Sequence, residues 1–228
     1  MRPGRVLFVG CGPGAPDLLT LRAVRAIAEA DVIVWSPALL DEAVVVEHAR
    51  PDAELVAWPP ATQHDVFGVY DRAAADGLRV VRLKGGDPTL FGELRDDLQA
   101  VRIRGLGYEI VPGVSAVAGG AATLGCEVAA RGAPLLLAAA GDGVQVDSVG
   151  VVGVLGAGRD PEAIARDLAA RGWPGSTPCA VLVGISRPGE IVVTCRLDEL
   201  AECIEDYGCG GLTTVLAGPS LTDARPGI

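Results

Sequence analysis

The residues best suited to chemistry lie in the run Arg82 to Gly92, RLKGGDPTLFG, where an apolar strand enters a Gly-Gly-Asp-Pro turn. Gly85 and Gly86 allow a ligand to approach the backbone closely and tolerate a positive φ. Asp87 can cap a following helix, and Pro88 suits the first helical position because its missing N–H needs no partner there. Turns with Gly, Asp and Pro between a strand and a helix are also common in α/β proteins that bind no ligand at this point. The run therefore predicts either a binding loop or an ordinary strand, turn and capped helix.

A second glycine-rich run, Gly10 to Asp17 (GCGPGAPD), follows the first apolar segment. A dinucleotide-binding fingerprint needs G-x-G-x-x-G with a helix beginning inside it. Here Ala15 replaces the third glycine and Pro13 stiffens the turn. The second strand ends in Trp35 and Ser36, where a ribose-binding acid would be expected. These details disfavour NAD binding, so a dehydrogenase remains a rival interpretation with little support.

The cysteines and histidines do not form a recognisable metal or catalytic pattern. No two cysteines make a C-x-x-C pair, and His48 and His64 both lie in polar, helix-like surroundings. Ser115 lacks the G-x-S-x-G elbow of a serine hydrolase. We therefore expect no metal site, and we expect reduced, mostly buried thiols. The cysteines are Cys11, Cys126, Cys179, Cys195, Cys203 and Cys209.

Alternating strands and helices must position these loops. The patterns predict strands over residues 5–10, 32–35, 54–57, 79–84, 108–111, 135–139, 151–155, 179–183, 190–195 and 212–217. They predict helices over residues 18–30, 38–48, 65–75, 88–104, 114–124, 161–171 and 197–207. Thr20 or Asp17 is expected to cap the first helix. The order indicates an α/β protein with an N-terminal domain over residues 1–112, which carries the glycine loops, and a C-terminal domain over residues 113–228.

Composition narrows the class of protein. Half of the 228 residues are hydrophobic but only 4% are aromatic, which favours parallel strands of Val and Leu covered by Ala-rich helices. A formal net charge of −10 and a pI near 4.7 argue against a nucleic-acid partner. No apolar run approaches the roughly 20 residues that span a bilayer, and the N-terminus enters a strand directly. We expect a cytoplasmic protein without a membrane partner.

Three segments, taken together, resemble the motifs of the tetrapyrrole (corrin/porphyrin) methylases in sequence, order and approximate spacing. They are residues 9–20 (VGCGPGAPDLLT), 82–88 (RLKGGDP) and 111–116 (VPGVSA). The resemblance covers nearly the whole chain and is weaker from Thr177 onward. It implies two α/β domains with mixed sheets flanked by helices and a cleft between them. It also implies S-adenosyl-L-methionine as methyl donor, a small-molecule tetrapyrrole as acceptor and a homodimer.

The resemblance also implies a set of donor contacts. The family's pattern falls on Gly85, Gly86, Asp87 and Leu90, on Ser115 and Ala116, on Pro13 and, in the second lobe, on Leu155 and Ile185. Glycine permits close backbone approach, while a carboxylate can bind an amino group or ribose hydroxyls. Because the sulfonium is already an activated electrophile, alignment supplies most of the acceleration, and no residue is assigned as the general acid or base.

The choice of acceptor rests on finer similarities. In uroporphyrinogen-III methyltransferases a catalytic aspartate follows the aromatic residue of the second strand, where this chain has Ser36. Residues 35–40 and 91–98 resemble precorrin-4 C(11)-methyltransferases instead, whereas Lys84 with Gly85 is the uroporphyrinogen type of sequence. The resemblance therefore implies C-methylation of a tetrapyrrole in cobalamin biosynthesis, most like precorrin-4 C(11)-methylation. The alternatives are uroporphyrinogen III or another precorrin as acceptor, or a divergent, non-catalytic binding member.

The charge of such an acceptor conflicts with the charge of the chain. Tetrapyrroles of this class carry several carboxylates, so a protein with a formal charge of −10 should slow their approach. Local basic residues must compensate. Arg82, Lys84 and Arg131 are candidates by their position in the sequence, although surface arginines are often simply solvated.

Overall fold

The structure is a computed structural model that describes residues 3–129, 132–140, 150–156, 161–207 and 212–224. The chain divides into two compact units, Met1–Ser115 and Ala116–Ile228. The sequence pattern places the domain boundary after Pro112, and the first unit ends three residues later, at Ser115. Each unit holds one five-stranded sheet, which confirms the predicted α/β class: the first sheet is parallel and the second is mixed.

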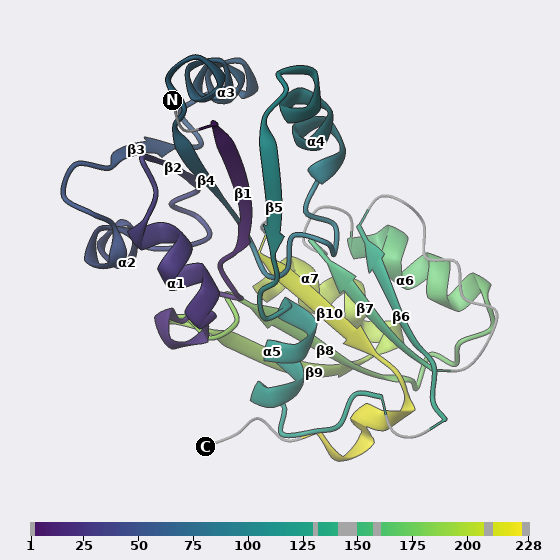
Figure 1. Ribbon diagram of the computed structural model, residues 1–228. Coiled ribbons are helices and arrows are strands. Elements are labelled where there is room, and N and C mark those ends of the chain that lie inside the picture. The colour runs from purple at the N-terminus through teal and green to yellow at the C-terminus, as the bar shows by residue number, and fades with distance from the viewer. Residues whose placement is uncertain (1–2, 130–131, 141–149, 157–160, 208–211, 225–228) are drawn as a thin grey trace. The chain divides into compact units, whose positions relative to one another are not determined.

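The sheet of the first unit is entirely parallel and has the order β3-β2-β4-β1-β5 (Figure 1). β1 and β2 are almost continuously buried, as expected of strands covered on both faces. The strands are β1 (Arg5–Gly10), β2 (Val32–Trp35), β3 (Glu54–Ala57), β4 (Arg79–Lys84) and β5 (Gly107–Val111).

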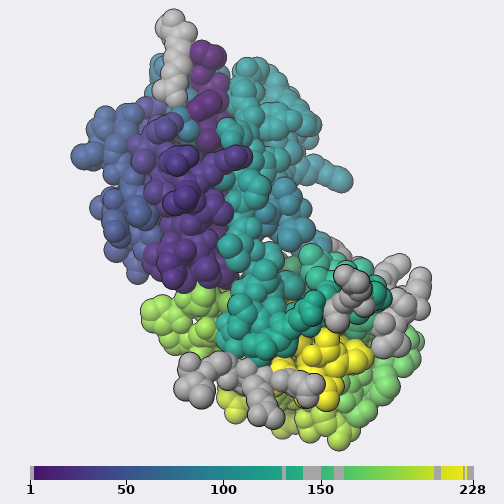
Figure 2. Space-filling view, turned by 60° about the horizontal axis from the view of Figure 1, so that its bottom comes forward, coloured from purple at the N-terminus to yellow at the C-terminus, as the bar shows by residue number. Residues whose placement is uncertain are grey.

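Helices cover both faces of this sheet. On one face Leu7 and Val9 pack with the apolar side chains of α1 and α2, and on the other Val6 and Phe8 pack with those of α3 and α4. The helices are α1 (Leu21–Ala28), α2 (Glu42–His48), α3 (Gln63–Asp76) and α4 (Leu94–Ile103), preceded by the short 3-10 helix η1 (Pro16–Leu18). In the space-filling view the purple surface, to which α1 contributes, lies between the blue and teal segments of this unit (Figure 2).

The second unit combines parallel and antiparallel strands in the order β6-β7-β10-β8-β9. Only β6 and β7 pair in parallel. Its strands are β6 (Leu135–Ala139), β7 (Val151–Leu155), β8 (Pro178–Val183), β9 (Ile191–Arg196) and β10 (Thr213–Ala217). Its helices are α5 (Ala116–Thr123), α6 (Pro161–Ala170) and α7 (Leu200–Tyr207), with the 3-10 helices η3 (Leu197–Glu199) and η4 (Pro219–Asp223). One core cluster includes side chains of α6 and α7, and the other those of α5.

Several helices begin later than the sequence pattern predicts. The hydroxyl of Thr20 caps α1 by accepting a bond from the Ala23 N–H at 3.1 Å, so the cap at Thr20 is confirmed and the helix starts at Leu21. Asp41 caps α2, which begins at Glu42 rather than at residue 38. In both cases the capping residue, rather than the apolar periodicity, determines where the helix begins.

The prediction of a helix from Pro88 is wrong for its first six residues. Phe91 and Glu93 have left-handed backbone angles, with φ of 57° and 50°, and α4 begins only at Leu94. Gly92 lies so close to the preceding turn that a Cβ there would be 2.2 Å from the carbonyl oxygen of Pro88. Asp87 and Pro88 therefore belong to a compact turn and do not start a helix.

The described part of the chain contains no helix that is both long enough and apolar enough to cross a membrane.

Candidate functional site

The glycine-rich loops follow strands that lie side by side in the first unit. The strand order places β1 between β4 and β5, and the segments after these three strands are the three motifs singled out in the sequence. From β1 the chain proceeds to β2 on one side, whereas from β4 it proceeds to β5 on the other. In open parallel sheets ligands bind at the carboxyl ends of strands where the order reverses in this way. The topology therefore indicates a site where the loops after β1 and β4 meet.

Backbone hydrogen bonds join these two loops directly. The Gly86 N–H donates to the carbonyl of Gly12 at 2.8 Å, and the Gly12 N–H donates to the carbonyl of Gly86 at 3.3 Å. Both glycines have positive φ, 72° at Gly12 and 58° at Gly86, a conformation that a residue with a Cβ adopts only at a cost. The two loops thus form one backbone platform at the carboxyl edge of the sheet.

The third loop packs against this platform without room for side chains. A Cβ at Gly113 would lie 2.1 Å from the carbonyl oxygen of Gly86, and one at Gly10 would lie 2.7 Å from the Cα of Gly113. At Gly85, in contrast, a Cβ would point at the Leu39 side chain, 2.9 Å from its Cδ2. Gly10 and Gly113 are therefore required by contact between loops of the protein, a reason that the sequence does not reveal.

Asp87 ties the loop after β4 to the loop after β5. Its Oδ2 accepts a hydrogen bond from the Gly113 N–H at 3.1 Å. Its Oδ1 accepts from the Thr89 N–H at 2.8 Å and from the Thr89 hydroxyl at 2.6 Å. Burial alone would raise the pKa of Asp87, but these three donors outweigh it and hold the pKa below its ordinary value. Asp87 is therefore ionised at neutral pH and joins two loops instead of capping a helix.

These groups fit the donor that the motifs imply. S-adenosylmethionine carries a positive sulfonium, an amino group and ribose hydroxyls. A carboxylate offers about four acceptor positions, of which Gly113 and Thr89 use three in the described structure. The bare backbone of Gly85 and Gly86 adds peptide groups that a ligand can approach closely. An anionic, backbone-rich platform of this kind suits a cationic nucleoside.

The remaining predicted contacts divide between the two units. Pro13 and Leu90 are both half-buried in the first unit. Pro13 directly follows Gly12, which pairs with Gly86. Leu90 lies in the turn after Asp87, and its N–H donates to the Asp87 carbonyl at 3.1 Å. Ser115 is the last residue of the first unit, and Ala116 begins α5. The structure thus brings Gly85, Gly86 and Asp87 together with the loops that carry Pro13 and Gly113.

Leu155 and Ile185 belong to the second unit. Leu155 ends β7, where its carbonyl accepts a hydrogen bond from the Ala140 N–H at 3.0 Å. Ile185 is buried in the apolar cluster beside α5, and a Cβ on Gly120 would approach its Cδ1 to 3.5 Å. Their assignment as donor contacts rests on the family pattern alone.

A buried polar network below the loop after β4 is the feature that sequence reasoning missed. Asp97 of α4 pairs with the Arg82 Nε at 3.2 Å and with the Lys84 Nζ at 2.9 Å. It also accepts a hydrogen bond from the Tyr70 hydroxyl at 3.1 Å. Arg82 and Lys84 are two positions apart in β4, so the sequence already places their side chains on one face of the strand. It does not show which carboxylate contacts them. Arg131, the third basic candidate, lies outside the described residues.

Burial in this network changes the acidity of its members. Desolvation raises the pKa of the Tyr70 phenol above its ordinary value. The pKa of Lys84 is lowered, first by burial and then by the neighbouring Arg82 guanidinium, against the opposing influence of Asp97. Lys84 therefore holds its ammonium proton less tightly than an exposed lysine does.

The end of β2 carries no acid. Ser36 is half-buried, and its carbonyl accepts hydrogen bonds from the N–H groups of Leu39 at 2.9 Å and Leu40 at 3.1 Å, which forms a turn before α2. The adjacent Trp35 is 4% exposed, and its indole Nε1 has no partner among the described residues. The end of β2 itself therefore offers a hydroxyl and an indole but no carboxylate for proton removal.

The described thiols do not form a reactive centre. Cys11 and Cys179 are buried, Cys126, Cys195 and Cys203 are partly buried, and none of these five forms a disulfide; Cys209 lies outside the described residues. Burial is the largest cause that raises the pKa of Cys179, to about 12, and it also raises that of Cys195. Within the described ranges no group of three histidine, cysteine or acidic residues is arranged to hold a metal ion.

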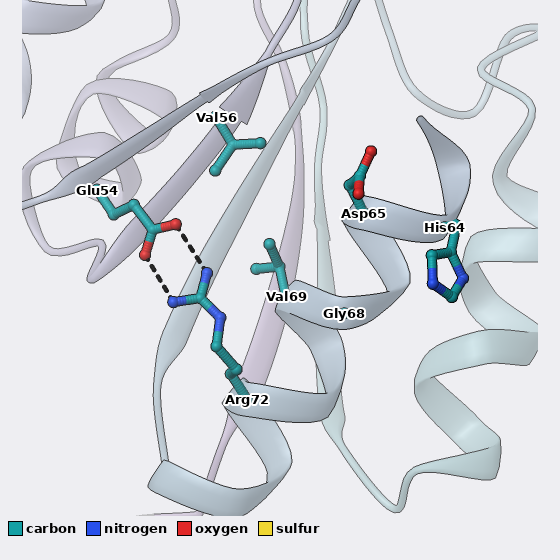
Figure 3. Close-up of a pocket in the computed structure, with 7 residues that line it drawn as sticks. All are labelled: Glu54, Val56, His64, Asp65, Gly68, Val69 and Arg72. Atoms are coloured by element: carbon teal, nitrogen blue, oxygen red, sulfur yellow. Dashed lines mark hydrogen bonds and ion pairs between the residues drawn. The ribbon is translucent and has the colours of Figure 1, made fainter. Parts of the chain in front are cut away.

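A separate cavity of about 380 Å³ lies between β3 and α3 (Figure 3). Glu54 and Arg72 form a double hydrogen bond across it, with lengths of 2.7 and 2.8 Å, which lowers the pKa of Glu54 and raises that of Arg72. Both side chains remain about half exposed, so the pair is a solvated one. β3 is the edge strand farthest from β5, and this cavity is not part of the glycine platform.

Comparison with known proteins links this platform to one family. The family model described as Tetrapyrrole (Corrin/Porphyrin) Methylases matches residues 5–201. The siroheme synthase of Methylococcus capsulatus is 35% identical over 94% of this chain and 49% of its own length. The chloroplastic S-adenosyl-L-methionine-dependent uroporphyrinogen III methyltransferase of Arabidopsis thaliana is 31% identical over 95% of this chain and 63% of its own. The chain thus spans about half to two thirds of the length of these relatives.

Two solved structures extend the comparison. Uroporphyrin-III C-methyl transferase from Thermus thermophilus, complexed with S-adenyl homocysteine, is 29% identical with a TM-score of 0.79, over 96% of this chain and 99% of that one. A cobalt precorrin-4 methyltransferase has a TM-score of 0.85 over 95% of both chains, but at 24% identity it supports the fold alone. The family match covers all three glycine loops and most of the second unit, and this chain belongs to the tetrapyrrole (corrin/porphyrin) methylases.

Proposed function

We propose that the protein is an S-adenosylmethionine-dependent C-methyltransferase that acts on a tetrapyrrole. The observation that carries the proposal is the platform of Gly12, Gly86 and Gly113 at the point where the strand order reverses, with the ionised Asp87 across it. It is supported by the family match and by the Thermus thermophilus relative, which was solved with S-adenyl homocysteine.

As acceptor we propose uroporphyrinogen III before precorrin-4. The Arabidopsis and Thermus relatives carry uroporphyrinogen or uroporphyrin in their names, and Lys84 with Gly85 is the corresponding type of sequence. Precorrin-4 is the second candidate, because residues 35–40 and 91–98 resemble the precorrin-4 C(11)-methyltransferases. The motif similarities around Trp35 favour precorrin-4, and the names of the relatives that match over most of this chain favour uroporphyrinogen III.

In this proposal the protein binds and orients, and does little covalent chemistry. S-adenosylmethionine supplies an activated methyl group on its sulfonium when it is bound. Gly85, Gly86 and Asp87, with Pro13 and Leu90, hold the donor, while the Asp87 carboxylate offers its remaining acceptor position to a donor N–H or O–H group. Ser115, Ala116, Leu155 and Ile185 complete the proposed contacts on the strength of the family pattern.

Methyl transfer makes the ring carbon quaternary and leaves the macrocycle positively charged, so a proton must leave from another position of the macrocycle, and Ser36 bears on how it leaves. A serine hydroxyl is too weak a base to take this proton, and the described end of β2 has no carboxylate. We propose that the proton is lost to solvent after methyl transfer, so the chain's contribution lies in alignment. The homodimer implied by the resemblance stays a prediction.

The first test is donor binding. Titration calorimetry with S-adenosylhomocysteine should show binding to the wild-type protein, and Asp87→Ala should weaken it by about 1 kcal/mol or more, roughly fivefold in Kd, because a charged hydrogen-bond partner is lost. Asp96→Ala removes an equal charge from the exposed side of α4 and serves as the control.

The outcomes separate the alternatives. No binding by the wild-type protein would rule out the methyltransferase, and equal affinity of wild type and Asp87→Ala would limit Asp87 to joining the loops. Donor and acceptor binding without methyl transfer would identify a non-catalytic member, the alternative that Ser36 favours.

A further inference from the structure

The buried network around Asp97 contains more positive than negative charge. Arg82 and Lys84 both form ion pairs with the same Asp97 oxygen, Oδ2, at 3.2 and 2.9 Å. The three side chains are 5%, 13% and 2% exposed, so water does little to screen them. Two cations therefore share one carboxylate inside the first unit.

The other members of the network supply no negative charge. The Gln63 amide bridges Arg82 and Asp97, the Tyr70 phenol donates to Asp97, and the Trp58 ring lies 5.1 Å from the Arg82 guanidinium carbon. Tyr70 stays protonated because its pKa is raised. Glu93 is a further acid that acts on Lys84, and it is exposed at the start of α4. A buried charge without a full partner is costly, so an excess of this kind calls for an explanation.

Hydrogen-bond donors of both cations are also left over. The Nη1 of Arg82 is buried and has no partner among the described residues. The Lys84 ammonium has three donors, and its ion pair with Asp97 uses one of them. Of the two cations Lys84 is the more exposed, and it ends β4 directly before Gly85. Lys84 therefore directly precedes the glycine platform in the chain, and Arg82 lies deeper, two residues earlier in β4.

We propose that the Lys84 ammonium, supported by Arg82, binds a carboxylate of the acceptor. This inference rests on the proposed function and adds a residue that recognises the substrate. An acceptor carboxylate supplies the negative charge that the network lacks and takes up the free donors of Lys84 in a charge-assisted hydrogen bond. It also resolves the conflict between a polycarboxylated acceptor and a chain with a formal charge of −10, because attraction is confined to one buried point.

The test uses uroporphyrin III, the stable and fluorescent oxidised form of the proposed acceptor, as a polycarboxylate probe. Its affinity is measured for the wild type, Lys84→Met, Lys84→Arg and the control Arg22→Met, which removes one positive charge from the exposed surface of α1. Lys84→Met should weaken probe binding tenfold or more, while Lys84→Arg stays within threefold of the wild type and Arg22→Met within twofold. S-adenosylhomocysteine affinity should change less than twofold in all three variants.

Each other result overturns the inference in a recognisable way. Probe affinity that is unchanged in Lys84→Met, or that falls equally in Arg22→Met, would show that Lys84 does not recognise a carboxylate. Loss of both ligands together with a lower melting temperature in Lys84→Met would show a purely structural role. A wild-type protein that binds S-adenosylhomocysteine but not the probe would overturn the Lys84 site and leave the donor site standing. Failure to bind either ligand would overturn the proposed function itself.

Discussion

At the scale of single residues, Asp87 and Gly113 explain why the platform keeps its shape. Asp87 reaches across 26 positions of sequence to the Gly113 N–H, and Gly113 in turn lies against the carbonyl of Gly86. Each residue is needed both for the contact between loops and, in our proposal, for access of the donor. A change at either position is therefore expected to affect stability and binding together.

Gly113→Ala tests the close packing of the loops. The added methyl would lie 2.1 Å from the Gly86 carbonyl oxygen, so the backbone must shift, and we expect a loss of about 1–3 kcal/mol in the free energy of unfolding. Urea denaturation measures this loss.

Gly68→Ala is the matched control for this substitution. Gly68 lies within α3 and has no atom within 4 Å of an added Cβ, so alanine should stabilise the protein there by about 0.5–1 kcal/mol. Equal effects of the two substitutions would contradict the packing argument.

At the scale of elements, the strands could be predicted closely from the sequence and the glycine loops could be located. β1, β2, β3 and β4 have the predicted bounds. For β1, β2 and β4 the reason is that buried parallel strands appear as short, largely apolar runs bounded by glycine or polar residues. The start of α4 could not be predicted, since Gly-Asp-Pro reads as a helix start and nothing local indicates left-handed angles at Phe91 and Glu93.

The same limit applies to the site. The loop residues could be chosen from their types, but the contact of Gly10 with Gly113 depends on β1 lying between β4 and β5. The pairing of Lys84 with Asp97 likewise depends on α4 covering the face of β4 that carries Lys84. Both are long-range arrangements that periodicity does not contain.

Thr62→Ala tests the start of α3, which carries Tyr70 and Gln63 of the buried network. The Thr62 hydroxyl accepts from the Asp65 N–H at 3.3 Å, and the Asp65 carboxylate accepts from the Thr62 N–H at 2.7 Å, which makes a capping box. Alanine should lower the free energy of unfolding by about 1 kcal/mol. Thermal unfolding measures the loss, and Thr62→Ser, which keeps the hydroxyl, should retain most of the wild-type stability. Equal loss in both variants would contradict this cap.

At the scale of the whole molecule, the long-range field and the proposed local site act in opposite directions. A chain with a formal charge of −10 repels a polycarboxylated acceptor at distances comparable to the screening length of about 10 Å in 0.1 M salt. The buried excess charge near Lys84 attracts it only at contact. Approach and retention of the acceptor should therefore respond differently to salt.

Stopped-flow measurements with uroporphyrin III test this balance. Raising the ionic strength from about 20 to 200 mM should increase the association rate constant, because screening weakens the repulsion. The dissociation rate constant should change much less, because the contact ion pair is buried and salt screens it little. An association rate that falls with salt would contradict the account and indicate a basic approach surface.

Methyl transfer is the central claim, and mass spectrometry of the product tests it most directly. The protein is incubated without oxygen with S-adenosylmethionine and either uroporphyrinogen III or precorrin-4, and Asp96→Ala and Asp87→Ala are run in parallel. We predict that uroporphyrinogen III gains the mass of at least one methyl group with the wild type and Asp96→Ala, and more slowly with Asp87→Ala. A folded wild-type protein that methylates neither tetrapyrrole would contradict the account.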